Sequence, residues 1–535
     1  MKLKQFSDDP FKTAQDPEAK VHEIELVNEQ PLTTRKELWS YYLFYNGDNG
    51  FTMFSYMPNI LQYLAYSAGY DSSDPAKLKP CDTNDPSIVC MIPFGSAGNI
   101  PVSSMVLYVQ AIAFVSQFLL FLTFGSLADY GSWGKWILLL TTFVACFCQI
   151  IPIAFNSPSQ WSGMMAIMIF ALISYGASLV FYAAAFPTLA DNLPVVRAAR
   201  NNPEMSKEEK MTIAEKWRNH VSTISTTWSN VGFLIVTSAL AGISHIPYNG
   251  KTLGDDTYKF NQIGTVFCGS FWVINAIWYF MFIPKGRQGP ALPKNSNYVT
   301  IGWKSVFKAL KEVKRLKQAF MYFIAYFLFS DGIATINQMV GIIQAQITSF
   351  DGTELTLLNL VSAVSSIIGC MGMLYLQKVL KVRTKIALLC ILCASTVVPI
   401  WGCFGIKFTT WGIHTRTELW IFYVWSGLAI APIYAWQQTM LAELIPKGKE
   451  GLFFGLFGIV NKASSWIGPV VIGAITNITY NQWNGWPFIL ALMIIPITII
   501  YFIDEEKAKE DIEEYLRVES AKEPTCLSME LEEKK

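Results

Sequence analysis

The chain has 535 residues, with 41 lysines and arginines against 40 aspartates and glutamates, which gives a formal charge of +1 at pH 7. Hydrophobic residues make up 52% and charged residues only 15%, well below the roughly 25% that is usual in soluble domains. A soluble protein of this length needs more charge to cover its surface. Nucleic-acid binding, intrinsic disorder and secretion as a soluble enzyme are therefore disfavoured, and an all-α membrane protein is expected.

Residues 1–36 are polar and contain no apolar core, so we expect a cytosolic tail and no cleavable signal peptide. Twelve stretches then follow that are long and apolar enough for a transmembrane helix, which takes about 20 residues. They lie near residues 38–67, 102–124, 134–155, 161–190, 220–244, 261–283, 319–347, 354–377, 385–406, 418–440, 450–476 and 485–503. We expect two six-helix bundles, 37–283 and 319–503, with a cytosolic linker at 284–318 and an acidic cytosolic tail at 504–535.

Basic residues are distributed unequally between the connections. If both termini lie in the cytosol, the connections on that side carry 34 of the 41 lysines and arginines, the opposite side carries 6, and Lys462 lies within a span. Short loops rich in lysine and arginine remain on the cytosolic side. The sequence therefore predicts an even number of spans with both termini in the cytosol.

The linker contains a basic amphipathic segment. Apolar residues such as Trp303, Phe307 and Leu310 recur at helical spacing opposite Lys304 and Lys311. This pattern predicts a helix that lies on the inner leaflet. A positioning helix between the two bundles is favoured over a calmodulin-type target.

The loop between the first two spans, residues 68–100, contains Cys81 and Cys90 nine residues apart. The outer or lumenal side of a membrane is oxidising, so we expect a disulfide between them. Most of the other cysteines lie in apolar runs, where the ordinary interpretation is a small buried hydrophobic residue.

An internal repeat relates the two bundles. The ends of the fourth and tenth spans, Tyr182–Pro194 and Tyr434–Pro446, share Tyr, Leu, Ala, an acid and Pro at the same spacing, 252 residues apart. The first and seventh spans each carry an aspartate in an aromatic run, Asp48 and Asp331. Matching span one to seven and span four to ten indicates two six-helix halves in parallel orientation.

The connection after the second span reads Gly125-SLA-Asp129-Y-Gly131-SWG-Lys135. It resembles the Gly-x-x-x-Asp-Arg-x-Gly-Arg-Arg pattern of the major facilitator superfamily, although Tyr130 stands where the pattern has arginine. The resemblance implies the major facilitator fold and a gating role for the Gly, Asp and Lys positions of this motif. The acids Asp191 and Glu443, at the cytosolic ends of spans four and ten, are expected to cap or gate.

The eleventh span contains Lys462-A-SSW-I-GP after Asn461. It is similar to the Thr-Asp-Lys-Gly-Ser-Ser-Trp-Leu-Gly-Pro pattern of the autophagy-related vacuolar amino-acid effluxers of fungi. Asn461 stands where that family usually has aspartate, which indicates a divergent member. The resemblance implies export of amino acids from the vacuole lumen to the cytosol, after autophagic degradation, by rocker-switch alternating access.

Three charges lie near mid-membrane depth: Asp48, Asp331 and Lys462. Such groups are costly in a bilayer and are by default functional. We expect Lys462 to face a substrate carboxylate and Asp48 or Asp331 to face an amine or carry a proton; the alternative is a permanent structural ion pair between Lys462 and one acid. The polar candidates for the same substrate-binding or coupling site are Asn46, Asn337, Gln338, Gln437, Gln438, Asn461, Ser464, Ser465 and Trp466.

The sequence offers little for enzyme chemistry. Its four histidines have no metal-ligand spacing, and no phosphate-binding glycine-rich loop followed by Lys and Ser or Thr occurs. We therefore expect no cofactor and no enzymatic activity, with an amino acid, the bilayer and candidate coupling protons as partners. The alternatives are a plasma-membrane carrier of another small solute and a non-transporting receptor on the same fold.

Overall fold

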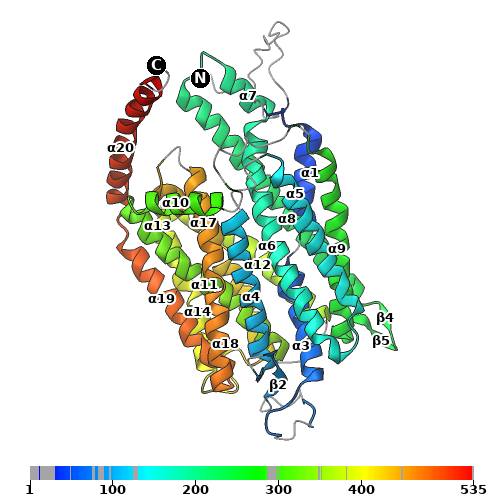
Figure 1. The fold of residues 1–535 in the computed structure, drawn as a ribbon. Helices are drawn as coiled ribbons and strands as arrows, with labels where there is room; N and C mark the ends of the chain where they lie inside the picture. The colour runs from blue at the N-terminus through cyan, green and yellow to red at the C-terminus, as the bar shows by residue number, and fades with distance from the viewer. Residues whose placement is uncertain are drawn as a thin grey trace.

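The computed structural model is a bundle of long helices (Figure 1). It describes residue 11 and residues 30–48, 50–74, 79–81, 89–95, 98–124, 131–284, 286, 297, 300–346, 350, 352–380, 382–446 and 450–532. Within these residues, nine helices are long and apolar enough to cross a membrane. We call the face where α1 begins and α19 ends the terminal face, and the opposite face, which carries a small β-sheet, the loop face.

The two halves are built from the following elements. The N-terminal half contains α1 (Arg35–Gly47), α2 (Phe51–Phe54), α3 (Tyr56–Ala68), β1 (Tyr70–Asp71), β2 (Cys90–Pro93), β3 (Asn99–Pro101), α4 (Val102–Phe124), α5 (Trp133–Ile150), η4 (Ile151–Ala154), η5 (Pro158–Gln160), α6 (Trp161–Asp191), α7 (Pro194–Asn201), α8 (Lys207–Ser244), β4 (Pro247–Tyr248), β5 (Lys251–Thr252), η6 (Leu253–Asp255) and α9 (Thr257–Phe282). The linker helix α10 (Thr300–Val313) leads to the C-terminal half, which contains α11 (Lys317–Gln346), α12 (Gly352–Leu380), α13 (Thr384–Ser395), α14 (Val397–Phe404), α15 (Arg416–Trp425), η7 (Ser426–Ile430), α16 (Ile433–Leu444), α17 (Glu450–Ser464), α18 (Ile467–Thr479), η8 (Gln482–Gly485), α19 (Trp486–Phe502) and the tail helix α20 (Glu505–Glu532).

The helices follow the order of the predicted spans. Spans two, four, six, seven, eight and twelve correspond to the continuous helices α4, α6, α9, α11, α12 and α19. The first, fifth and tenth predicted spans are not among the nine helices that are long and apolar enough to cross a membrane. Spans one and ten are broken into short segments, and span five belongs to the 38-residue helix α8, whose first half is polar.

Local sequence explains where these helices begin and break. Helix α8 starts well before the predicted 220–244 segment, because Ser206 and Glu209 form a capping box at its N-terminus. Span ten contains the π-helical turn η7 and then Pro432, which cannot donate the backbone hydrogen bond of a regular helix. Such interruptions are tolerated in a membrane where neighbouring helices cover the freed backbone groups.

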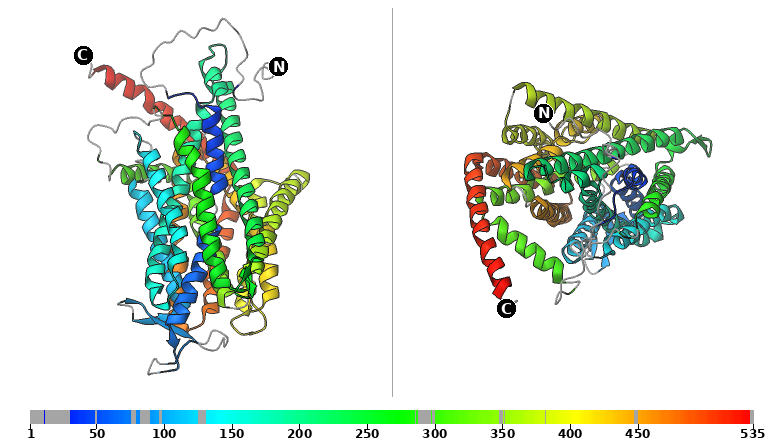
Figure 2. Two further views of the ribbon diagram at one scale, coloured as in Figure 1. Left: turned by 90° about the vertical axis from the view of Figure 1, so that its right-hand side faces the viewer. Right: turned by 90° about the horizontal axis from the view of Figure 1, so that it is seen from above.

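The halves contact each other mainly toward the loop face. Among the described residues, the hydrogen bonds between the halves are Tyr56 Oη with Thr356 Oγ1 at 3.4 Å, Thr353 Oγ1 to Ser244 Oγ at 2.9 Å, and Thr257 Oγ1 to the Phe350 carbonyl at 3.1 Å. Seen from the terminal face, the helices of the two halves gather on different sides (Figure 2). The structure is thus joined at the loop face.

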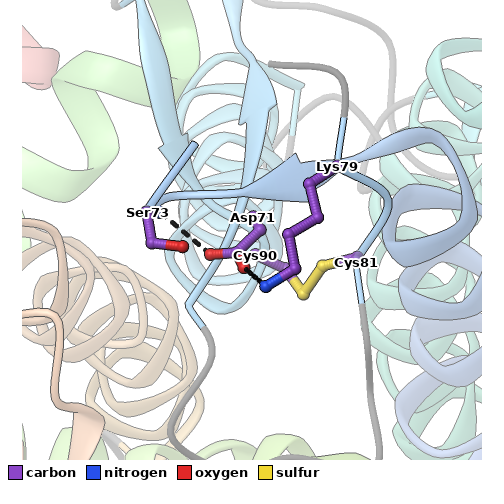
Figure 3. Close-up of a disulfide and its surroundings, with 5 residues drawn as sticks. All are labelled: Asp71, Ser73, Lys79, Cys81 and Cys90. Carbon is purple, nitrogen blue, oxygen red and sulfur yellow. Dashed lines mark hydrogen bonds and ion pairs between the residues drawn. A yellow bond between two sulfur atoms is a disulfide. The ribbon is translucent and has the colours of Figure 1, made fainter. Parts of the chain in front are cut away.

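The loop face carries a three-stranded antiparallel sheet in the order β1-β2-β3. A disulfide joins Cys81 to Cys90 beside it, as Figure 3 shows. The Lys79 ammonium donates to Asp71 Oδ2 at 2.6 Å and the Ser73 amide donates to Asp71 Oδ1 at 2.8 Å. These two donors lower the pKa of Asp71 from 3.8 to about 2, so the carboxylate holds this loop together over a wide pH range.

The tail helix α20 packs on the start of α11 at the terminal face. The Gln318 amide donates to Asp511 Oδ2 at 3.4 Å, and the Asp504 amide donates to Gln318 Oε1 at 3.0 Å. The Arg315 guanidinium lies 5.8 Å from the centre of the Tyr515 ring. In Figure 1 and in the view from above in Figure 2, α20 lies on the side of the C-terminal half.

Candidate transport site

The first predicted site residue, Asp48, lies where span one breaks between α1 and α2. Its side chain is 4% exposed, and neither carboxylate oxygen has a hydrogen-bond partner within the described part of the chain. The neighbouring polar group is the Tyr175 hydroxyl of α6. Gly50 makes this approach possible, because a Cβ there would lie 2.0 Å from Tyr175 Oη. A buried carboxylate whose neighbouring polar group is one hydroxyl, with no ion pair among the described residues, can bind a cation or take up a proton.

The predicted residue Asn46 fixes α1 against α8. Its side-chain amide donates to the Trp228 carbonyl at 2.9 Å. At the same crossing a Cβ on Gly232 would lie 1.8 Å from the Asn46 carbonyl oxygen. Small residues let membrane helices approach to backbone contact. The close contact at Asn46 and Gly232 therefore fixes the end of α1, next to Asp48, against α8.

The second predicted acid, Asp331, has a different environment. It lies within the continuous helix α11 and is 1% exposed. Its Oδ1 accepts the Gly468 amide of α18 at 3.2 Å and the Thr335 hydroxyl at 3.4 Å. The first amides of a helix lack intrahelical partners and attract negative charge. Asp331 therefore stabilises the start of α18.

The glycine of this contact is required by packing. A Cβ on Gly468 would lie 1.8 Å from Thr335 Oγ1. The helix begins again here after the break in span eleven, where α17 ends at Ser464 and Trp466 is the half-buried N-cap of α18. By contrast, Gly332 on α11 packs against Met493 within an unbroken helix.

The remaining polar residues of the eleventh-span motif hold the end of α17, where the span breaks, against α11. The Asn461 side-chain amide donates to Ser330 Oγ at 2.6 Å. The hydroxyls of Ser464 and Ser465 donate to the Asn461 carbonyl at 3.0 and 2.6 Å. Asn461, Ser464 and Ser465 thus stabilise the backbone conformation between α17 and α18.

Lys462 lies in the last turn of α17, directly beside these residues. Its side chain is half-buried, so part of it stays accessible. Among the described residues it forms no ion pair, and neither Asp48 nor Asp331 is paired with it. A permanent pairing of Lys462 with either acid is therefore not what the structure contains.

The other predicted polar residues divide into two groups. Gln338 and Gln437 are buried, and the Tyr322 hydroxyl donates to the backbone carbonyl of Gln437 at 2.7 Å. Asn337 and Gln438 are exposed. Both exposed residues lie within helices of the C-terminal half.

The predicted gating residues are placed at the terminal face. Thr384 Oγ1 donates to Glu443 Oε1 at 2.6 Å, at the edge of a cavity of about 310 Å³ between α12, α13, α16 and α20. Asp191 is the last residue of α6. Gly131 has φ +54°, the left-handed conformation that favours glycine in a tight turn, and Lys135 lies in the first turn of α5. Gly125 and Asp129 lie outside the described residues.

Sequence reasoning missed the partners of these groups. Four of these partners come from other helices than the predicted residues that they contact: Tyr175, Trp228, Ser330 and Thr384. Thr335 contacts Asp331 from the next turn of α11. The aromatic and hydroxyl residues of membrane helices are too common to single out by composition, and their spacing carries no signal of which helix they face.

The comparison with protein families decides the identity. Residues 33–513 match the model of the family described as "Vacuole effluxer Atg22 like". The chain belongs to this family. Proteins named "Autophagy-related protein 22" are similar over most of their length: that of Candida glabrata is 24% identical over 486 residues, covering 86% of this chain and 87% of the relative. That of Yarrowia lipolytica is 25% identical over 464 residues, covering 77% and 78%.

Solved structures share the fold of this Atg22-like chain. The nucleoside transporter NupG superposes with a TM-score of 0.53 at 11% identity, covering 88% of this chain and 99% of that one. A POT family transporter in complex with 5-aminolevulinic acid gives 0.54 at 12% identity, covering 90% and 99%. The chain therefore shares the fold of these two structures.

Proposed function

We propose that this Atg22-like protein exports amino acids from the vacuole lumen to the cytosol by alternating access of its two halves. The family description and the names of its relatives support the vacuole and autophagy. The observation that carries the substrate class is Lys462: an ammonium in the last turn of α17, partly accessible and without an ion pair among the described residues. A free cation in such a place fits the carboxylate that all amino acids share.

The two acids take different roles in this proposal. Asp48, buried and without an amide donor among the described residues, receives the substrate amine or a coupling proton. Asp331 is already engaged by the Gly468 amide and holds the start of α18. Because α18 begins five residues after Lys462, the Asp331 contact positions the lysine as well as the break.

The predicted orientation completes the proposal. With both termini in the cytosol, the loop face lies in the lumen, and the hydrogen bonds between the halves lie on the lumenal side. The state described here is then closed to the lumen. Rocking of the halves would break these contacts and admit substrate, with Asp129, Lys135, Asp191 and Glu443 at the cytosolic ends as gating residues.

The test is uptake of labelled amino acids by proteoliposomes, with and without an imposed pH gradient. Flux of at least one amino acid is expected, and a dependence on the gradient supports proton coupling through Asp48. Absence of flux for every amino acid under both conditions would refute the amino-acid assignment.

Substitution of Lys462 tests the substrate contact within that assay. Lys462→Ala should lower flux roughly 10- to 150-fold, because a hydrogen bond to a charged group is worth about 1.5–3 kcal/mol. The matched control is Lys251→Ala, at an exposed lysine of the loop face, which should transport normally. Equal flux in both variants, at equal amounts of folded protein, would exclude Lys462 as the carboxylate ligand.

A further inference from the structure

The linker helix α10 is attached to the rest of the protein by one face. A Cβ on Gly302 would lie 2.3 Å from the Leu122 carbonyl oxygen, so this turn of α10 is in backbone contact with the end of α4. Val313, at the other end, is 1% exposed and belongs to the hydrophobic core. Helix α10 also packs against α17, the helix that ends near Lys462. It therefore connects the terminal-face ends of one helix from each half.

A second face of α10 is apolar and exposed. Trp303, Phe307 and Leu310 are 37%, 65% and 36% exposed. At about 100° per residue these three side chains fall within a stripe of about 60°, next to the buried face. An exposed aromatic stripe of this kind on a membrane protein is matched to the apolar boundary of a bilayer.

A third face of α10 is basic. Lys304 and Lys311 are exposed and lie on the side of the stripe that points away from the buried residues. The helix contains three lysines and a single acid, Glu312. Around α10, the face packed against the protein is thus followed by the exposed apolar face and then by the basic face. A helix that lies in a membrane surface beside a protein has its faces in this order.

We propose that α10 binds anionic phospholipids through Lys304 and Lys311. This lipid contact stabilises the packing of α10 against α4 and α17. Lysines beside an anionic leaflet are attracted to its headgroups, while the aromatic residues enter the boundary between headgroups and acyl chains. A protein that wraps an amphipathic helix is a poorer fit, because the Gly302 and Val313 face is already packed inside this chain.

Thermal unfolding of the full-length protein in detergent tests the proposal without requiring transport. Added phosphatidylserine should raise the Tm, phosphatidylcholine should raise it much less, and high salt should weaken the difference. In the double variant Lys304→Glu, Lys311→Glu the apparent affinity for phosphatidylserine should fall roughly 30-fold or more. Soluble glycerophosphoserine should give no shift, which separates a lipid from a free headgroup.

The matched control reverses two exposed charges of α20, Lys507→Glu with Arg517→Glu, and should keep the lipid response of the native protein. The pair Trp303→Ala, Phe307→Ala should weaken the response to phosphatidylserine while the lysines remain. An equal Tm shift in the native protein and in the Lys304, Lys311 variant would overturn the proposal, as would an equal shift with phosphatidylcholine.

Discussion

The two halves of the molecule use repeat-related residues in opposite ways. In the N-terminal half Tyr182 is 3% exposed, and its hydroxyl donates to the Tyr41 carbonyl at 2.9 Å and meets Ser225 Oγ at 2.8 Å. Its counterpart Tyr434 is 51% exposed, and its hydroxyl has no hydrogen bond among the described residues. The aspartates are reversed: among the described residues no amide donates to Asp48, whereas Asp331 accepts the Gly468 amide.

The difference separates scaffold from working parts in each half. In the N-terminal half, Tyr41 and Tyr182 stack with ring centres 4.2 Å apart and make a rigid contact between α1 and α6. In the C-terminal half, the Asp331 contact fixes the start of α18, while Lys462 forms no ion pair among the described residues. The sequence repeat therefore conserves the architecture while the chemistry of the two halves diverges.

The largest expected effect comes from neutralising the two aspartates separately. Asp48→Asn should lower flux roughly 10- to 100-fold with little loss of stability, because it removes a buried charge that no amide or cation stabilises among the described residues. Asp331→Asn keeps an oxygen that can accept the Gly468 amide, so flux should fall less. Proteoliposome uptake together with thermal unfolding measures both variants. The reverse order of flux would assign the working carboxylate to the C-terminal half.

The next effect concerns the glycines that let helices approach these acids. Gly232→Ala places a Cβ 1.8 Å from a backbone oxygen, that of Asn46, and should destabilise by about 1–3 kcal/mol through overpacking. Gly468→Ala meets the Thr335 side chain instead. The second substitution Thr335→Ala should therefore restore stability to Gly468→Ala. The free energies of unfolding of the single and double variants test this. A lack of rescue would mean that the packing around Gly468 is as inflexible as the packing around Gly232.

Much of the architecture could be predicted from the sequence. Twelve apolar stretches, the matching ends of spans four and ten, and the Cys81–Cys90 pair are local or periodic signals, and the helices, the two halves and the disulfide follow them. The roles of Asp48 and Asp331 could not be separated in the same way. Their difference depends on where spans one and eleven break and on which helix lies opposite, and these are contacts between residues more than 100 positions apart.

A smaller effect distinguishes the repeat-related tyrosines. Tyr182→Phe keeps the ring stack but removes the hydroxyl that bonds to Tyr41 and Ser225, so it should lower the free energy of unfolding by about 1 kcal/mol. Tyr434→Phe removes a hydroxyl that has no hydrogen bond among the described residues and should leave stability unchanged. Equal losses in the two variants would show that Tyr434 is held as firmly as Tyr182. Any change in flux for Tyr434→Phe alone would place it beside the substrate.

The smallest effect lies in the loop of the N-terminal half that contains the hydrogen-bonded acid Asp71. Folding lowers the pKa of this carboxyl from 3.8 to about 2, so its stabilising effect is fully present above about pH 4 and is lost as the pH falls toward about 2. Hydrogen exchange of the Ser73 amide, which donates to Asp71 Oδ1, should be faster in Asp71→Asn than in the native protein at neutral pH. The two rates should converge in acid. Because Lys79 is 56% exposed, salt should reduce the difference. Equal exchange rates in the native protein and Asp71→Asn at neutral pH would mean that the disulfide alone orders this loop.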